Sequence, residues 1–127
     1  MPRVPDIPDA FDVYTVVVLR RPADAPDLPE EDLDALQARH LAFRAELRRR
    51  ELLVANGPFD KQSDPSYRGM SIFACGPAEA ARLSDGDPLV VAGRLAYDVM
   101  EWWVGARMLA FPLTEGPVGD RRTMPDD

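Results

Sequence analysis

Runs of apolar residues along the chain predict four strands and two helices. β-branched and aromatic residues gather in short segments bounded by glycine or proline, which is typical of strands. Longer segments, in which apolar residues recur every three or four positions, are typical of helices that cover a sheet. The predicted strands span residues 13–19, 52–56, 69–75 and 95–104, and the predicted helices span 30–50 and 77–83, with a further helical turn at 89–93.

The order of these elements is β-α-β-β-α-β, which predicts an α+β fold of ferredoxin-like layout. In that arrangement a four-stranded antiparallel sheet carries both helices on one face. The strand at 13–19 is apolar on both of its alternating faces, so the face away from the helices also has apolar area to cover. A two-fold homodimer packed sheet against sheet, a dimeric α+β barrel, is the simplest cover.

Prolines mark the expected boundaries of this single domain. The chain has 127 residues, a length typical of one domain, and 13 prolines that cluster near its start, at 22–29 and near its end. We expect an extended N-terminal arm over residues 1–11, the domain over 12–113 and a flexible C-terminal tail over 114–127.

Composition and charge exclude several classes of partner. The net charge of −7 opposes binding to nucleic acid, whose phosphates attract clustered lysine and arginine. No apolar run approaches the ~20 residues of a membrane-spanning helix, and the first residues lack the apolar segment of a secretory signal, so we expect a cytoplasmic protein. The single cysteine, Cys75, lies in an apolar run typical of a buried hydrophobe.

The predicted helix at 30–50 contains the only histidine of the chain. Its apolar positions are spaced three, seven and four residues apart, and His40 fills the gap that completes a continuous stripe. The stripe predicts that His40 faces inward, with Leu33, Leu36, Phe43 and Leu47.

Three landmarks then occur in order: His40, the pair Gly57-Pro58 seventeen residues later, and the segment 87–93, which reads Asp-Pro-Leu-Val-Val-Ala-Gly. Together they resemble the YciI-like family, over roughly residues 13–104. The resemblance implies a ferredoxin-like fold that dimerises through its sheet, with an active-site pocket beside a paired histidine and aspartate. These two residues correspond to His40 and Asp87.

One branch of that family resembles a dehydrochlorinase acting on a chlorinated hydroxyquinol, with the histidine and aspartate handling protons. The chain departs from the family pattern at Glu51, where glycine is common, and at 101–103, where a Lys-Pro-aromatic ending is common. Glu51 is therefore expected either to cap the helix differently or to be mildly strained.

Histidine is well suited to proton transfer because an imidazole both accepts and donates a proton near neutral pH. A carboxylate such as Asp87 would fix the tautomer of His40 and stabilise the imidazolium. We therefore expect a cofactor-independent lyase, isomerase or dehydrochlorinase-like enzyme that acts on a small aromatic or enolisable substrate. Arg44, Gly57 and Pro58 are the expected substrate-binding residues.

Each of these residues also has a structural interpretation. His40 and Asp87 could form a clamp between helix and turn in a non-catalytic dimer that binds a small ligand or a protein. Asp87 and Gly57-Pro58 could simply turn the chain, and Arg44 could be solvated beside the apolar stripe. Core or interface positions are expected for the aromatic residues Tyr97, Trp102 and Trp103.

No metal or nucleotide cofactor is predicted. One histidine and one cysteine are too few for a zinc site, and no glycine-rich phosphate loop follows a strand. A serine nucleophile stays open as a further alternative, although no recognisable nucleophile turn surrounds the candidates Ser63, Ser66, Ser71 and Ser84.

Overall fold

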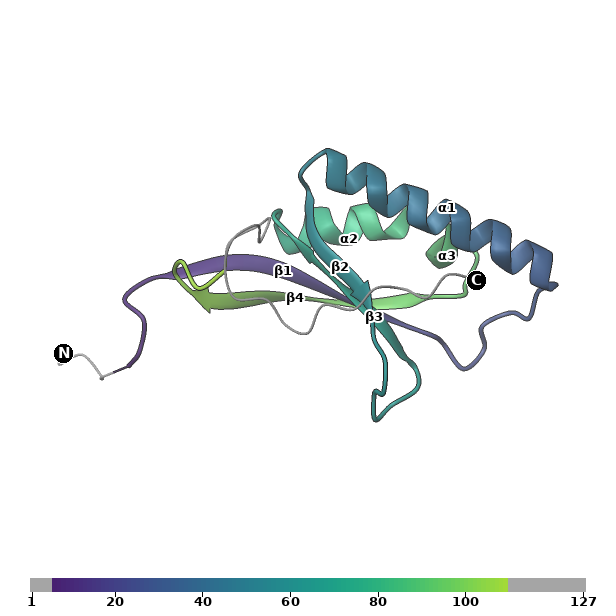
Figure 1. Ribbon diagram of the computed structural model, residues 1–127, viewed down its shortest axis with the longest axis horizontal. Helices are drawn as coiled ribbons and strands as arrows, with labels where there is room; N and C mark the ends of the chain where they lie inside the picture. The colour runs from purple at the N-terminus through teal and green to yellow at the C-terminus, as the bar shows by residue number, and fades with distance from the viewer. Residues whose placement is uncertain (1–5, 110–127) are drawn as a thin grey trace, which may run out of the picture.

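The computed structural model describes residues 6–109 and folds them into one antiparallel sheet with helices on a single face (Figure 1). The order of the elements confirms the predicted ferredoxin-like α+β fold. In chain order the elements are β1 (Phe11–Arg20), α1 (Glu30–Arg49), β2 (Leu53–Pro58), β3 (Tyr67–Phe73), α2 (Pro77–Asp85), α3 (Pro88–Val91) and β4 (Ala96–Gly105).

The sheet has the strand order β2-β3-β1-β4, and all neighbouring strands are antiparallel. Strand β1 is central, as its apolar sequence predicts. Its residue Val17 lies opposite Ser71 of β3 and Val99 of β4, which fixes the register of both ladders. This register brings the end of β1 beside the start of β3.

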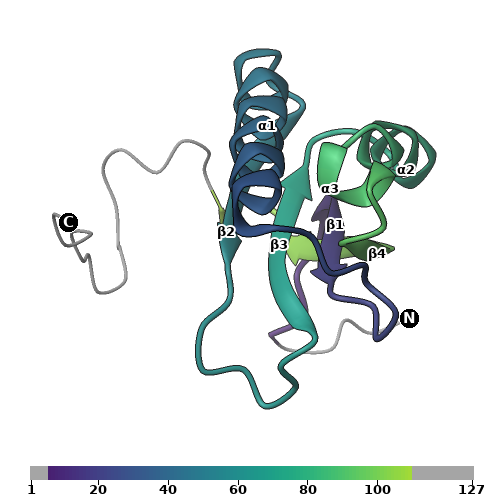
Figure 2. The same cartoon turned by 90° about the vertical axis from the view of Figure 1, so that its right-hand side faces the viewer.

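All helices lie on the same side of the sheet, and the opposite side carries none within the described residues (Figures 1 and 2). Helix α1 contacts β2 and α3, while α2 contacts β1 and β4. Between the helices and the sheet lies the hydrophobic core, whose most buried members are Val17, Leu47, Leu53, Phe73 and Ala80.

Helix α1 begins and ends as its sequence predicts. Acidic residues occupy its first turn and arginines its last, in agreement with the helix dipole. After the last turn the chain reverses at Glu51, whose φ is +60°, and the backbone N–H of Leu52 donates to the carbonyl of Leu47 at 3.1 Å. This is a glycine-type cap made by a glutamate, so the strain expected at Glu51 is present.

Several element ends differ from the predicted ones. Strand β3 begins at Tyr67 rather than at residue 69, because Tyr67 pairs with Arg20 across a bulge in the ladder. Helix α2 continues to Asp85. The predicted tail at 114–127 lies outside the described residues. None of the described helices is long and apolar enough to cross a membrane.

The sheet face without helices carries an apolar surface. Along each strand, the residues of this surface alternate with those that face the core. They include Val16, Ile72, Met70, Met100 and Trp102. Met100 is 44% exposed and Trp102 38%. Trp103, which alternates with them, is 60% exposed and contacts Phe11 in a tilted arrangement, with the ring centroids 5.7 Å apart. In this single chain the two tryptophans therefore lie outside the core, contrary to the core interpretation.

Candidate active site

A cavity of about 220 Å³ opens between α1 and the ends of β1, β2 and β3. Leucine side chains form its apolar wall, from Leu19, Leu41, Leu89 and Leu95. The polar part of the lining consists of Arg21, Gln37, His40, Arg44, Asn56, Arg68 and Ser71. The cavity thus brings together His40 and Arg44, expected from the sequence, with residues that sequence reasoning did not select.

Asp87 lies directly behind this lining. It precedes Pro88, the first residue of α3, and its side chain accepts a hydrogen bond from the Leu89 backbone N–H at 2.9 Å. An aspartate that caps a helix beginning with proline is a favourable local arrangement. The turn-forming interpretation of Asp87 is therefore correct, and the same turn holds its carboxylate in a fixed position.

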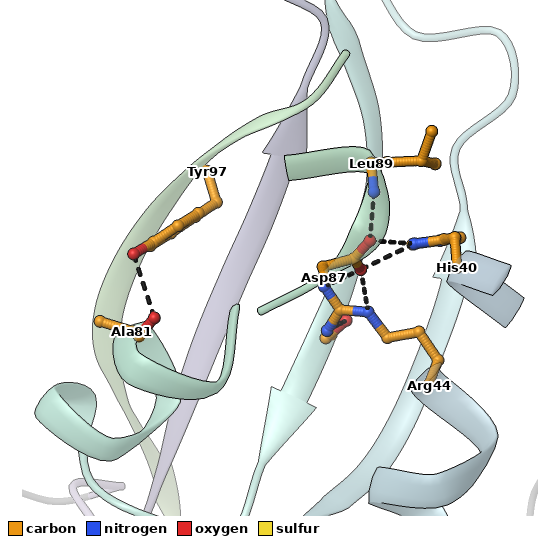
Figure 3. A network of polar contacts seen from close by, with 7 residues as sticks. His40, Arg44, Ala81, Asp87, Leu89 and Tyr97 are labelled. Atoms are coloured by element: carbon orange, nitrogen blue, oxygen red, sulfur yellow. Dashed lines mark hydrogen bonds and ion pairs between the residues drawn. The ribbon is translucent and has the colours of Figure 1, made fainter. Parts of the chain in front are cut away.

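The carboxylate of Asp87 joins two residues of α1 to the α3 turn (Figure 3). His40 Nδ1 lies 2.7 Å from Oδ2 and 2.9 Å from Oδ1. Arg44 Nε donates to Oδ2 at 3.0 Å, and Arg44 Nη1 donates to Ser71 Oγ on β3 at 3.2 Å. We call these four residues, His40, Arg44, Ser71 and Asp87, the buried charge network.

The network keeps Asp87 ionised. Burial by itself would raise the pKa of this fully buried carboxyl, but the hydrogen bond from His40 and the charge of Arg44 lower the pKa. Together with the Leu89 N–H they hold the pKa of Asp87 below its ordinary value. Because the carboxylate can only accept hydrogen bonds, His40 Nδ1 carries a hydrogen toward it.

Arg44 is a buried cation, with 2% of its surface exposed. The solvated interpretation of this residue is therefore wrong. Burial lowers the pKa of Arg44 and the adjacent Asp87 offsets only part of that shift, but a guanidinium stays charged at physiological pH. Its Nη2 is 3.0 Å from Asp87 Oδ2 but is not aligned for a hydrogen bond, and its Cζ lies 5.9 Å from the centre of the Phe73 ring.

Three members of the network line the cavity, and His40 is the most exposed of them. Its side chain is 12% exposed, whereas that of Asp87 is completely buried. No hydrogen bond within residues 6–109 involves His40 Nε2, so the nitrogen opposite Asp87 is available to a molecule in the cavity. An imidazole held at Nδ1 by a carboxylate and available at Nε2 is equipped to accept a proton.

Gly57 and Pro58 end β2 and line the same cavity. In the β2–β3 ladder Pro58 lies opposite Gly69, and a Cβ on Gly69 would lie 2.6 Å from the Gly57 carbonyl oxygen. Gly69 therefore permits a close backbone approach that Gly57 itself does not require. The glycine with the strict steric requirement is one that sequence reasoning did not single out.

Two further arginines, Arg21 and Arg68, line the cavity and were not predicted as site residues. Arg21 directly follows β1 and Arg68 lies at the start of β3, and the antiparallel register places these two chain segments side by side. We call them the rim arginines. No sequence motif marks them, because only the pairing of these two strands brings them together.

The other predicted candidates lie elsewhere. The Tyr97 hydroxyl lies 3.1 Å from the Ala81 carbonyl (Figure 3). It donates to Asp85 Oδ1 at 2.5 Å, and this hydrogen bond raises the pKa of Tyr97 to about 12. No serine among the described residues hydrogen-bonds to His40. Over the same residues, no group of three or more His, Cys, Asp or Glu side chains could hold a metal ion.

The sequence matches no family model and no curated protein. Among solved structures, the chain is similar to 5-chloro-2-hydroxyhydroquinone dehydrochlorinase from Burkholderia phenoliruptrix, in complex with 2,5-dihydroxybenzoquinone. The two share 20% sequence identity over 72% of this chain and 93% of that chain, with a TM-score of 0.49.

Proposed function

We propose that this protein is a cofactor-independent enzyme of the YciI-like family that transfers protons on a small aromatic or enolisable substrate. The supporting observation is the arrangement of one imidazole, with Nδ1 on the buried Asp87 carboxylate and Nε2 without a partner in a cavity. General acid/base catalysis requires a proton acceptor of this kind within reach of the substrate.

In the proposed reaction His40 Nε2 takes a proton from an acidic C–H or O–H of the substrate. The electron pair of that bond moves to a neighbouring carbonyl oxygen in a tautomerisation, or expels chloride when chlorine is attached to the adjacent carbon. Asp87 stabilises the imidazolium that forms, and His40 returns the proton to the enolate or releases it to water. Gly57 and Pro58 serve as the wall against which the substrate lies.

Arg44 has two proposed roles. Its Nε and Nη1 hold the Asp87 carboxylate and the Ser71 hydroxyl, so it positions the residue that positions His40. Arg44 also lines the cavity, so its second role is contact with a bound substrate. An Arg44 variant should therefore lower activity mainly through misplacement of Asp87 and His40.

The experiment that tests this function is hydrogen–deuterium exchange in candidate substrates. In D₂O, proton NMR follows exchange of C–H positions in 1,2,4-trihydroxybenzene and phenylpyruvate, and a chloride electrode follows release from 5-chloro-2-hydroxyhydroquinone. We expect catalysis by the wild-type protein and a loss of about 10²–10⁴-fold in His40→Asn. Equal rates for the two proteins, or no catalysis with any of the three compounds, would refute the proposal.

A second candidate function is a ligand-binding module without catalysis. It is favoured by the fact that the buried charge network joins α1, β3 and α3, as a structural clamp would. The clamp requires His40→Ala to cost about 1–3 kcal/mol of stability, because a buried carboxylate loses a donor. His40→Asn with an unchanged melting temperature but lost exchange would favour the enzyme, and the reverse pattern would favour the clamp.

We also propose that the protein is a homodimer that buries the apolar sheet face described above. A contiguous apolar surface on a monomer is a common sign of an interface. A charged residue on this face should break such a dimer, so Met100→Arg is expected to halve the mass measured by light scattering after gel filtration. Lys61→Glu, on the exposed β2–β3 loop, is the control, and a wild-type monomer would refute the dimer.

A further inference from the structure

The lining of the cavity is positively charged although the chain as a whole is acidic. Three arginines line it and no aspartate or glutamate does, while the net charge of the chain is −7. Asp87, behind the lining, balances only one of these positive charges, that of Arg44. A cavity lined by one sign of charge attracts and binds ligands of the opposite sign.

The rim arginines have no carboxylate partner in the part of the chain that the structure describes. Within residues 6–109 neither Arg21 nor Arg68 forms an ion pair. Arg21 Nε donates to the Arg94 carbonyl at 3.0 Å, and this hydrogen bond orients the guanidinium of Arg21. Arg68 Nη1 donates to the Pro65 carbonyl over the longer distance of 3.5 Å. Asp64, four residues before Arg68, accepts the Ser66 N–H instead.

Positive charges are also concentrated here at some energetic cost. Burial lowers the pKa of Arg21, and the charges of Arg94 and Arg68 lower it further. An anion placed between such arginines would relieve their repulsion and satisfy the remaining N–H donors. The planar forks of guanidinium groups match the two oxygens of a carboxylate.

Position and size then restrict the ligand. Arg68 is three residues before Ser71 on β3, so their backbones are separated by ~10 Å along the strand. Arg44 donates to Ser71, so the buried charge network lies at the Ser71 end of this stretch of β3. The rim arginines lie at its Arg68 end. A cavity of about 220 Å³ equals the space of about seven waters, which suits one substituted six-membered ring.

We propose that Arg21 and Arg68 bind the carboxylate of a small aromatic or enolisable acid whose reacting end lies at His40. This inference rests on the proposed function and deepens it, because it names the charge and the orientation of the substrate. None of the residues that line the cavity is an aspartate or glutamate that would compete with the ligand for the rim arginines. Leu19, Leu41 and Leu95 contact the ring between the two polar ends.

Calorimetric titration of the full chain tests the inference with three ligands: 2,5-dihydroxybenzoate, the uncharged 2,5-dihydroxybenzamide and inorganic phosphate. The benzoate should bind at least about tenfold more tightly than the amide, and more tightly than phosphate. Its affinity should fall about tenfold or more in Arg68→Gln and in Arg21→Gln. Arg39→Gln, which removes a charge from the exposed side of α1, is the matched control and should change little.

Equal affinities for acid and amide, equal losses in Arg68→Gln and Arg39→Gln, or no binding of either ring compound would overturn the inference. Phosphate binding as tight as benzoate binding would also overturn it, since the rim would then be a general anion site. The outcome is separable from that of the proposed function. His40→Asn should still bind the benzoate, while exchange of uncharged 1,2,4-trihydroxybenzene depends on His40 whether or not the rim arginines bind acids.

Discussion

The two ends of the cavity use the same residue type in opposite ways. At the buried end, Arg44 is almost completely buried and its charge is met by Asp87, which also accepts hydrogen bonds from His40 and the Leu89 N–H. At the rim, Arg21 and Arg68 are more exposed and meet no carboxylate among the described residues. The buried end is electrostatically complete without a ligand, whereas the rim is not.

This difference separates stability from binding. Breaking a buried ion pair is strongly destabilising, because a single unpaired charge in the interior is costly. An unpaired charge at the rim costs little in water and becomes useful when an anion arrives. The buried network should therefore respond to mutation mainly through stability and catalysis, and the rim mainly through affinity.

The largest effect is expected from Asp87→Asn. The amide leaves the charge of Arg44 buried without a counter-charge, so the variant should lose about 3–5 kcal/mol in the free energy of unfolding, measured by urea titration. Asp98→Asn, which breaks the exposed ion pair with Arg20, is the control and should have little effect. A loss at Asp87 no larger than that of the control would show that the network does not stabilise the fold.

The next effect is the pH dependence of the difference in unfolding free energy between the wild type and Asp87→Asn. Because the pKa of Asp87 is depressed in the folded protein, its contribution is fully present above the unfolded value of ~3.9 and is lost as pH falls through the folded value. The stability gap between wild type and Asp87→Asn should be constant near neutral pH and shrink in acid. A gap that stays the same down to pH 2 would mean that Asp87 has an ordinary pKa.

The smallest effect on stability is expected at the rim. Arg68→Gln should change the free energy of unfolding by no more than about 0.5 kcal/mol, because no buried partner is left behind. The same substitution at Arg44 should be strongly destabilising, since the carboxylate of Asp87 would remain buried. Similar unfolding curves for the two variants would remove the distinction between the two ends.

The strands, α1 and the inward position of His40 were predictable because each follows from local periodicity and from proline and glycine punctuation. The contact of His40 with Asp87 came from a resemblance between motifs, not from spacing. The sequence did not decide whether Arg44 is buried or solvated. An arginine beside an apolar stripe is buried only if a carboxylate from a distant segment meets it, and here that carboxylate, Asp87, lies 43 residues later.

The rim arginines could not be predicted, since only the antiparallel register of β1 and β3 brings Arg21 and Arg68 to one cavity. The exposure of Trp103 could not be predicted for the same reason. Its alternation with Trp102 in β4 is typical of a strand, but the pattern does not reveal that β1 and β4 extend past the helices (Figure 1). Long-range pairing decides what a strand residue contacts, and local sequence does not contain it.

The claim on which the proposed function depends is that Asp87 holds His40 through Nδ1 and leaves the lone pair of Nε2 in the cavity. Because the chain has a single histidine, ¹⁵N-edited NMR of histidine-labelled protein reports this imidazole alone. At about pH 9, where an imidazole is neutral, we predict the Nδ1–H tautomer in the wild type, with that preference weakened in Asp87→Asn. A dominant Nε2–H tautomer in the wild type would contradict the account.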